Sequence, residues 1–125
     1  MIYQPSSYRR LSECHPDLQR VIIAAAEEKD FVVTCGHRGE EDQNIAFATG
    51  RSKVRWPNGK HNSRPSKAVD LAPWPIDWAD LGRFDKLGLH VLEVAGRLGV
   101  EVSWGGDWVR FKDRPHIELK GSSGG

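Results

Sequence analysis

The sequence predicts a small α+β domain in which helices pack on a mostly antiparallel sheet. At 125 residues the chain has the length of one domain, enough to bury about two thirds of its unfolded surface. Apolar residues recur at helical spacing in some segments and alternate in others. The expected order is helix, strand, helix, strand, helix, strand, strand. We expect one domain over residues 1–120, followed by a flexible C-terminal tail, GSSGG, over 121–125.

The first half of the chain is expected to form two helices and one strand. Pro16 suits the first turn of a helix, and residues 16–29 carry an amphipathic pattern made by Leu18, Val21, Ile22 and Ala25. The short segment FVVTC, 31–35, is rich in β-branched residues and predicts a strand. Residues 40–49 predict a short helix, whereas the Pro, Gly, Asn and Ser of 51–66 predict a long loop. Loops of that length in compact domains are usually functional or disordered.

The second half predicts three strands and one long helix. AVDLA, 68–72, is expected to be a strand, and Asp77 is a suitable N-cap for the helix that follows. An apolar stripe then continues to Gly99, a typical residue at a helix end. The segments 100–104 and 115–119 alternate between apolar and polar residues and predict the last two strands.

Composition excludes several classes of function. The formal net charge is +1, so the chain lacks the basic field of a nucleic-acid-binding protein. No segment approaches the roughly 18–20 apolar residues of a membrane span, and the N-terminal residues lack the apolar core of a secretory signal. We therefore expect no nucleic-acid partner, no membrane insertion and a protein that stays in the cytoplasm where it is made. Cys14 and Cys35 are expected to be free thiols.

An acidic residue inside an apolar strand points to a metal site. Asp70 lies between apolar neighbours, where a carboxylate is costly unless it is paired or bound to a cation. His61 ends the long polar loop and His116 begins a strand after a charged turn, so both side chains can point into one cleft. Two histidines and one carboxylate are a common ligand set for catalytic zinc. The alternative is that Asp70 lies on the polar face of an edge strand or accepts hydrogen bonds from a nearby turn.

Hydrolysis at such a metal also requires a group that moves a proton. Asp113 lies on the turn before His116 and can reach over the metal. Glu118 shares a strand face with His116 and is either a partner that orients this histidine or a rival base. For both carboxylates a solvated surface position is the alternative. The remaining histidines are expected to have no catalytic role: His15, His37 and His90.

Four segments together carry a resemblance to a known family: GHRGEEDQ at 36–43, HNSRPSKAVD at 61–70, WGGDW at 104–108 and DRPH at 113–116. Their order resembles that of the zinc peptidases related to VanX, VanY and the phage L-alanyl-D-glutamate endolysins, which cleave peptidoglycan stem peptides. The sequence departs from the family at two points. The gap between His61 and Asp70 is about two residues longer than usual, which a loop can absorb at small entropic cost. Ser66 and Lys67 replace the family's Gly before Ala68.

The resemblance implies a role for each residue of the site. His61, Asp70 and His116 would bind Zn²⁺, and Asp113 would act as general base and then general acid. Arg38 would hold the substrate carbonyl or its developing oxyanion with a fixed positive charge.

Other residues near these motifs have structural alternatives. Without the family, a salt bridge to Glu40 or Glu41 is the simpler interpretation of Arg38. Gln43 is interpreted as structural, because it would steady the loop of Arg38. Four tryptophans can line either the peptide cleft or the core: Trp74, Trp78, Trp104 and Trp108.

The resulting hypothesis is a zinc-dependent peptidoglycan peptidase of the endolysin type, with the L-alanyl-D-glutamate bond of the stem peptide as its expected target. We expect a monomer of phage or prophage origin that waits in the host bacterial cytoplasm until a holin opens the membrane, and then acts on the cell wall. One alternative keeps the metal site but makes the protein a D-Ala-D-Ala carboxypeptidase or dipeptidase. Another makes it a catalytically silent domain that binds the wall or a protein.

Overall fold

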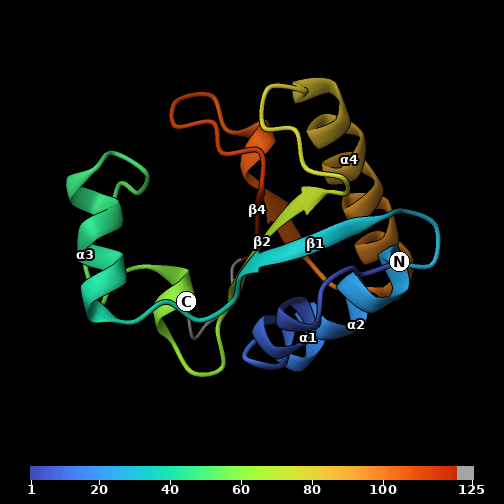
Figure 1. The fold of residues 1–125 in the computed structure, drawn as a ribbon. Helices are drawn as coiled ribbons and strands as arrows, with labels where there is room; N and C mark the ends of the chain where they lie inside the picture. The colour runs from blue at the N-terminus through green and yellow to red at the C-terminus, as the bar shows by residue number, and fades with distance from the viewer. Residues whose placement is uncertain (121–125) are drawn as a thin grey trace.

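A computed structural model describes residues 1–120 of the chain. The elements follow the order α1 (Pro5–Ser12), α2 (Pro16–Ala25), β1 (Phe31–Cys35), α3 (Glu40–Ala48), the 3₁₀ turn η1 (Lys60–Asn62), β2 (Ala68–Pro73), α4 (Leu81–Leu98), β3 (Val102–Trp104), the 3₁₀ turn η2 (Gly105–Asp107) and β4 (His116–Leu119). Figure 1 shows the strands at the centre of the molecule, with α3 set apart from the other helices. The predicted tail at 121–125 lies outside the described residues.

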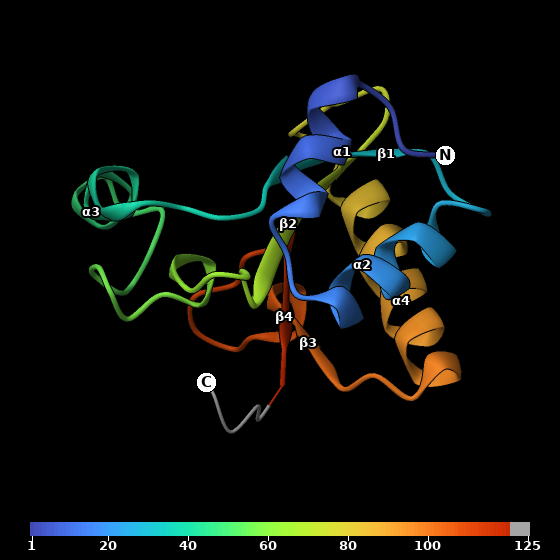
Figure 2. The same ribbon diagram turned by 90° about the horizontal axis from the view of Figure 1, so that it is seen from below.

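The four strands form one sheet in the order β1-β2-β4-β3, and every neighbouring pair is antiparallel. This confirms the predicted α+β class. Seen from below, α1, α2 and α4 lie on one side of the sheet, and α3 with the long loop lies on the other (Figure 2). The side of the sheet with α1, α2 and α4 holds the main core. The opposite side is therefore available for a functional site.

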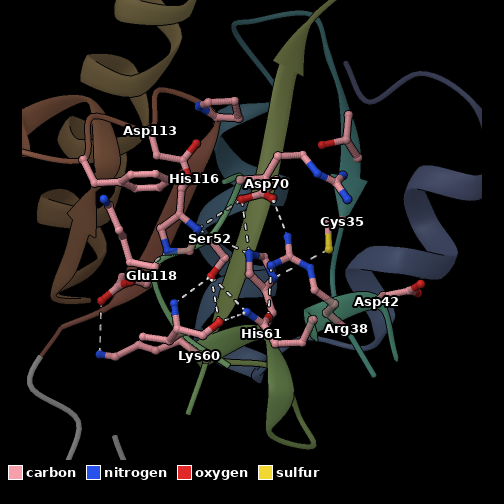
Figure 3. A pocket seen from close by; sticks show the side chains of 18 of the residues that line it. Cys35, Arg38, Asp42, Ser52, Lys60, His61, Asp70, Asp113, His116 and Glu118 are labelled. Carbon is pink, nitrogen blue, oxygen red and sulfur yellow. Dashed lines mark hydrogen bonds and ion pairs between the residues drawn. The ribbon is translucent and has the colours of Figure 1, made fainter. Parts of the chain in front are cut away.

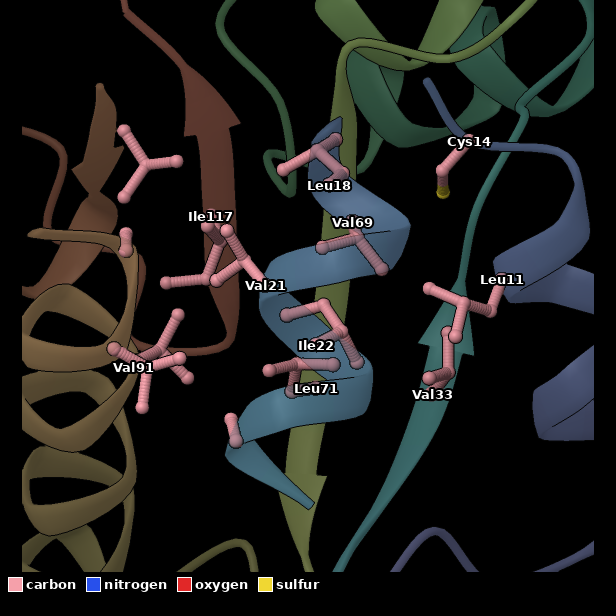
Figure 4. Close-up of a cluster of buried hydrophobic side chains, with 14 of the residues drawn as sticks. Leu11, Cys14, Leu18, Val21, Ile22, Val33, Val69, Leu71, Val91 and Ile117 are labelled. Carbon is pink, nitrogen blue, oxygen red and sulfur yellow. The ribbon is translucent and has the colours of Figure 1, made fainter. Parts of the chain in front are cut away.

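Strand alternation separates the core from the polar face. Val69 and Leu71 of β2 and Ile117 of β4 point into the main cluster of buried apolar side chains (Figure 4). Asp70 is paired with His116 across the two strands, and both side chains point to the other face. Since β2 lies between β1 and β4, the interpretation of Asp70 as part of an edge strand is wrong.

The first helix was not predicted from the sequence. In α1 only Ser7 and Leu11 are buried, so the helix has too little apolar periodicity to be recognised. Its side chains instead bond to the backbone of β1: the Ser7 hydroxyl accepts from the Val33 N–H at 3.0 Å, and Arg10 donates to the Val33 carbonyl at 3.1 Å. The helix thereby covers the outer edge of the sheet, which would otherwise expose unpaired backbone groups.

Other boundaries differ by a few residues. The helix α2 ends at Ala25 rather than 29, and β3 begins at Val102 rather than 100. The predicted cap Asp77 is wrong: α4 begins at Leu81, and the Asp80 side chain accepts from the Arg83 N–H at 3.3 Å. Asp77 instead belongs to a turn: its side chain accepts from the Ala79 N–H and its carbonyl from the Asp80 N–H, both at 3.0 Å. Among the described residues, no helix is long and apolar enough to cross a membrane.

Candidate metal centre and cleft

Three polar side chains from separate segments converge on the open face of the sheet. Asp70 and His116 come from paired positions of β2 and β4, and His61 comes from η1. The His61 Nε2 lies 3.3 Å from Asp70 Oδ1 and 3.3 Å from His116 Nδ1, and the third distance, from His116 Nδ1 to Asp70 Oδ1, is 3.2 Å. Figure 3 shows these side chains directed toward one another. The structure therefore brings together the three residues that the sequence predicted as ligands.

The spacing of these three atoms fits a tetrahedral zinc ion. Zinc bonds to imidazole nitrogen and carboxylate oxygen at about 2.0–2.2 Å, so neighbouring ligand atoms in a tetrahedron stand about 3.3–3.5 Å apart. The three observed separations, 3.2 to 3.3 Å, lie at or just under this value. The donor set thus has the chemistry and the spacing that Zn²⁺ requires.

Both histidines are oriented by hydrogen bonds to their other ring nitrogen. His61 Nδ1 lies 2.7 Å from the Gly36 carbonyl oxygen, which makes Nδ1 the donor and directs Nε2 toward Asp70 and His116. His116 Nε2 lies 2.7 Å from Glu118 Oε1, and Lys60 Nζ lies 3.3 Å from the other oxygen of Glu118. Such outer contacts fix the tautomer and ring orientation of metal-binding histidines. The two oxygens of Glu118 therefore each contact another residue, His116 and Lys60, at the side of the site.

The protonation of these groups reflects their mutual attraction. Burial alone would raise the pKa of Asp70, but the positive charge of His61 and the hydrogen bonds from both histidines hold it well below its usual value. Burial lowers the pKa of His61, yet the charge and hydrogen bond of Asp70 outweigh this effect and raise it to about 10. The pKa of His116 is also raised, against burial, by its hydrogen bonds to Asp70 and Glu118. Without a cation, His61 carries the positive charge that the Asp70 carboxylate needs.

Cys35 lies beside the site, a position the sequence did not reveal. The register between β1 and β2 shifts after Val33, so that Cys35 rather than Thr34 pairs with Asp70, as at a β-bulge. Cys35, His61 and Asp70 offer possible ligand atoms within 4.8 Å of one another. However, Cys35 Sγ approaches His61 at Nδ1, at 3.7 Å, which is the nitrogen that bonds Gly36. His116 Nδ1 therefore completes the set of three mutually close atoms, and Cys35 belongs to the surroundings of His61.

Arg38 reaches the same centre from the segment after β1. Its Nη2 lies 3.6 Å from Asp70 Oδ2, and its Nη1 donates to Gln43 Oε1 at 3.1 Å. Gln43 is almost fully buried, and its oxygen also accepts from the Asn62 side chain. Among the described residues, the alternative salt bridge of Arg38 to Glu40 or Glu41 is not formed. Gln43 holds the guanidinium in place, as its structural interpretation predicted.

Asp113 lies in the turn before β4, beside His116 in the view of Figure 3. Its backbone carbonyl accepts from the His116 N–H at 3.1 Å, and its own N–H donates to the Gly105 carbonyl. Burial raises the pKa of the Asp113 carboxyl, and the nearby negative charge of Asp70 adds to this rise, while the positive groups of the site oppose it. The side chain is thus a partly buried carboxyl with an affinity for a proton above that of a surface aspartate.

The centre opens into a cleft of about 1000 Å³ that is lined by β1, the long loop and the segment before β4. Two tryptophans line it: Trp78, which is 57% exposed and stacks on Phe84, and Trp108, whose ring lies 5.2 Å from that of His116. Trp104 is buried in the core, and Trp74 stacks on Tyr3. Two of the four tryptophans therefore line the cleft, and the other two pack against neighbouring side chains.

The other three histidines have separate environments. His15 caps α2 by accepting from the Asp17 N–H at 3.0 Å, and the buried His90 bonds to the Ala25 carbonyl at 3.2 Å. His37 lines the cleft, and its Nε2 is buried without a hydrogen-bond partner among the described residues. Cys14 and Cys35 are free thiols, as predicted.

Known proteins of one family resemble this chain in sequence and in structure. A family model described as phage L-alanyl-D-glutamate peptidase matches residues 2–122. The chain is 33% identical over 128 residues to the peptidoglycan L-alanyl-D-glutamate endopeptidase CwlK of Bacillus subtilis (strain 168), covering 86% of this chain and 74% of that protein. The crystal structure of the L-Ala D-Glu endopeptidase ChiX of Serratia marcescens is similar, with a TM-score of 0.82 and 29% identity over 95% of this chain and 90% of that one. This chain therefore belongs to the phage L-alanyl-D-glutamate peptidase family.

Proposed function

We propose that the protein is a zinc-dependent endopeptidase that hydrolyses the L-alanyl-D-glutamate bond of peptidoglycan stem peptides. The observation that carries this proposal is the set of three ligand atoms, 3.2 to 3.3 Å apart, at the bottom of a cleft in a chain of this family. Zinc at this position would polarise the scissile carbonyl and acidify a bound water. His61, Asp70 and His116 would hold the ion, and Glu118 would keep the His116 ring in the orientation that binding requires.

Asp113 is assigned the proton transfers. As a base it would take the proton of the attacking water, and as an acid it would return that proton to the nitrogen of the leaving D-glutamate. The raised pKa of its carboxyl supports this double role, because a group that holds its proton more firmly than a surface aspartate is a stronger base toward water. Glu118 suits this role less well, because its two oxygens already face His116 and Lys60.

Arg38 is assigned the stabilisation of negative charge on the substrate. Its guanidinium is held by Gln43 and lies at the mouth of the metal site, 3.6 Å from Asp70. A positive group fixed in this way would attract the oxygen of the scissile carbonyl more strongly as that oxygen gains charge in the transition state. The guanidinium would act through its fixed charge, so its contribution needs no proton transfer.

The two alternatives make different predictions. The named relatives are both L-Ala-D-Glu endopeptidases, which favours the endopeptidase over a D-Ala-D-Ala carboxypeptidase or dipeptidase. The presence of Asp113 and Arg38 beside a complete ligand set argues against a catalytically silent binding domain.

Digestion of purified muropeptides, followed by mass analysis with and without a chelator, tests the proposal. We expect the release of the stem peptide that begins with D-glutamate, and loss of this product when zinc is removed. Release of one alanine or of an alanine dipeptide would assign the D-Ala-D-Ala activity instead. Retention of intact peptidoglycan without any cleavage by the zinc-loaded protein would assign the binding role.

A biological role in phage lysis is a further part of the proposal. The family model is named for phage enzymes, whereas the two named relatives come from bacteria. We propose a monomer that is made in the host cytoplasm and reaches the wall through a holin. Added protein should then lyse cells whose membrane barrier has been permeabilised, and expression inside intact cells should cause lysis only together with a holin.

A further inference from the structure

We infer that the outer part of the cleft is a subsite for a carboxylate of the substrate, formed by Arg51, Lys53 and Lys112. The ligand would be the free carboxylate of the glutamate residue on the leaving side of the scissile bond. The inference rests on the proposed function and adds the group by which the substrate is selected.

The three cations belong to two opposite walls of the cleft. Arg51 and Lys53 follow α3, Lys112 precedes β4, and all three line the cleft with exposed side chains. The Lys53 ammonium lies 5.1 Å from the centroid of the Phe111 ring, on the opposite wall. This contact joins the segment after α3 to the segment before β4, and both residues line the cleft. An anion between the walls would meet positive charge from both sides.

The charges of the cleft are sorted by depth. Two of the inner carboxylates are engaged, since Asp70 lies between the two histidines and Glu118 lies against His116 and Lys60. The third, Asp113, forms no ion pair over residues 1–120 and is kept for the proton transfers. Over residues 1–120, by contrast, Arg51, Lys53 and Lys112 form no ion pair, and Arg51 only donates to the Thr49 hydroxyl at 3.2 Å. The exposed carboxylate of Asp42 also lines the cleft. The outer part of the cleft therefore has three cations, Arg51, Lys53 and Lys112, against this one carboxylate.

The chemistry of the substrate requires such a partner. In an L-alanyl-D-glutamate bond, the amino group of glutamate forms the amide, so neither of its two carboxyl groups takes part. The peptide continues through one carboxyl, and the other stays free and negative at neutral pH. A charge therefore stands within a few bonds of the leaving nitrogen, and amidation of that carboxyl removes it without changing the scissile bond. A cationic mouth would distinguish the two forms by charge.

The expected size of the effect is modest for each cation. Exposed ion pairs change an equilibrium by roughly 1.5- to 5-fold, so two cations together should change KM by roughly 2- to 25-fold at low salt. The effect should decrease as salt screens the exposed charges. The chemical step, which takes place at the inner end of the cleft, should change little.

The test compares two substrates and two variants. Peptides that contain L-alanyl-D-glutamate, with the glutamate carboxylate either free or amidated, are digested by the zinc-loaded wild type, by Lys53→Gln/Lys112→Gln and by the control Lys86→Gln. Lys86 is exposed on α4 and does not line the cleft. We expect the wild type to favour the free acid through a lower KM, the double variant to lose this preference with kcat retained, and the control to match the wild type.

The inference is overturned if the double variant and the wild type show the same ratio of kcat/KM for the two peptides. It is also overturned if the variant loses activity equally on both, because that result indicates general attraction to anionic material rather than a carboxylate subsite. If the wild type cleaves neither peptide, the proposed function itself fails. Unchanged zinc content and unfolding midpoint of the double variant show that it is folded.

Discussion

Replacing Glu118 by glutamine separates the binding of zinc from the proton transfer. The Glu118 carboxylate lies 2.7 Å from His116 Nε2 and is 19% exposed. Hydrogen bonds to a charged group contribute about 1.5–3 kcal/mol and neutral ones about 0.5–1.5 kcal/mol. Glutamine can still accept from Nε2 through its amide oxygen, so the variant should lose about 1–1.5 kcal/mol of the interaction that orients His116. This loss corresponds to a roughly 10-fold weaker affinity for zinc.

The same substitution should not leave another charge without a partner. Lys60 loses its ion pair with Glu118, but its Nζ still donates to the Leu119 carbonyl at 2.8 Å. We therefore expect Glu118→Gln to fold normally. Its zinc Kd, measured by competition with a chromogenic chelator, should rise roughly 10-fold, while kcat at saturating zinc should fall only a few-fold.

The matched variant Asp113→Asn should show the opposite pattern. Asp113 is not a zinc ligand in our assignment, so its zinc Kd should stay within about twofold of the wild type. Its kcat should fall roughly 10²- to 10⁴-fold, the usual contribution of a general acid or base. If Glu118→Gln instead keeps its zinc affinity and loses kcat by a factor of about 100 or more, Glu118 is the base and the role given to Asp113 is wrong.

Three further predictions concern protons, packing and the support of Arg38. The pKa of His61 is raised to about 10 in the metal-free site, so zinc must displace protons when it binds. Calorimetry in buffers of different ionisation enthalpy should therefore detect proton release at pH 7, and the affinity for zinc should rise with pH. A binding enthalpy that is the same in every buffer contradicts this prediction. Gly88→Ala should destabilise by about 1–3 kcal/mol in urea unfolding, since a Cβ there would lie 2.1 Å from Trp104, whereas Gly96→Ala on the same helix meets nothing within 4 Å and should be neutral or stabilising. Gln43→Ala should cost about 1–3 kcal/mol and lower kcat at unchanged zinc affinity; unchanged kcat would refute its support of Arg38.

The elements that position the site could be predicted because their side chains show the periodicity. Strand alternation in AVDLA puts Asp70 on the face opposite to Val69 and Leu71, and the same alternation in PHIEL puts His116 and Glu118 on one side. Antiparallel pairing then brings Asp70 and His116 into register. Two of the three donors, Asp70 and His116, followed from the residue types and this geometry, whereas His61 was predicted from its residue type and its place at the end of the polar loop.

The missed features depend on the backbone. The helix α1 interacts with β1 through the backbone of Val33, so its sequence carries little apolar signal. The register shift that aligns Cys35 with Asp70 leaves no mark in the side-chain pattern of FVVTC. The acceptor that orients His61 is the carbonyl of Gly36, and a carbonyl is present at every residue. Composition and spacing cannot reveal contacts of this kind.

The loop before β2 explains how a nine-residue gap still places His61 beside Asp70. The 3₁₀ turn of Lys60–Asn62 bends the chain back toward the sheet, and the buried Ser66 fixes its other end by backbone hydrogen bonds to Glu13 and His15, each 2.8 Å long. The Ser66 hydroxyl has one proton to donate, and its oxygen lies 2.6 Å from the Ala68 carbonyl oxygen and 3.2 Å from the Gly36 carbonyl oxygen. The shorter contact makes the Ala68 carbonyl the acceptor, so this bond fixes the start of β2. Glycine, which the family has at this position, has no side chain to form that bond. The serine that replaces it therefore helps to hold the strand of Asp70 in place, so the departure from the family pattern is compatible with the convergence of His61 and Asp70.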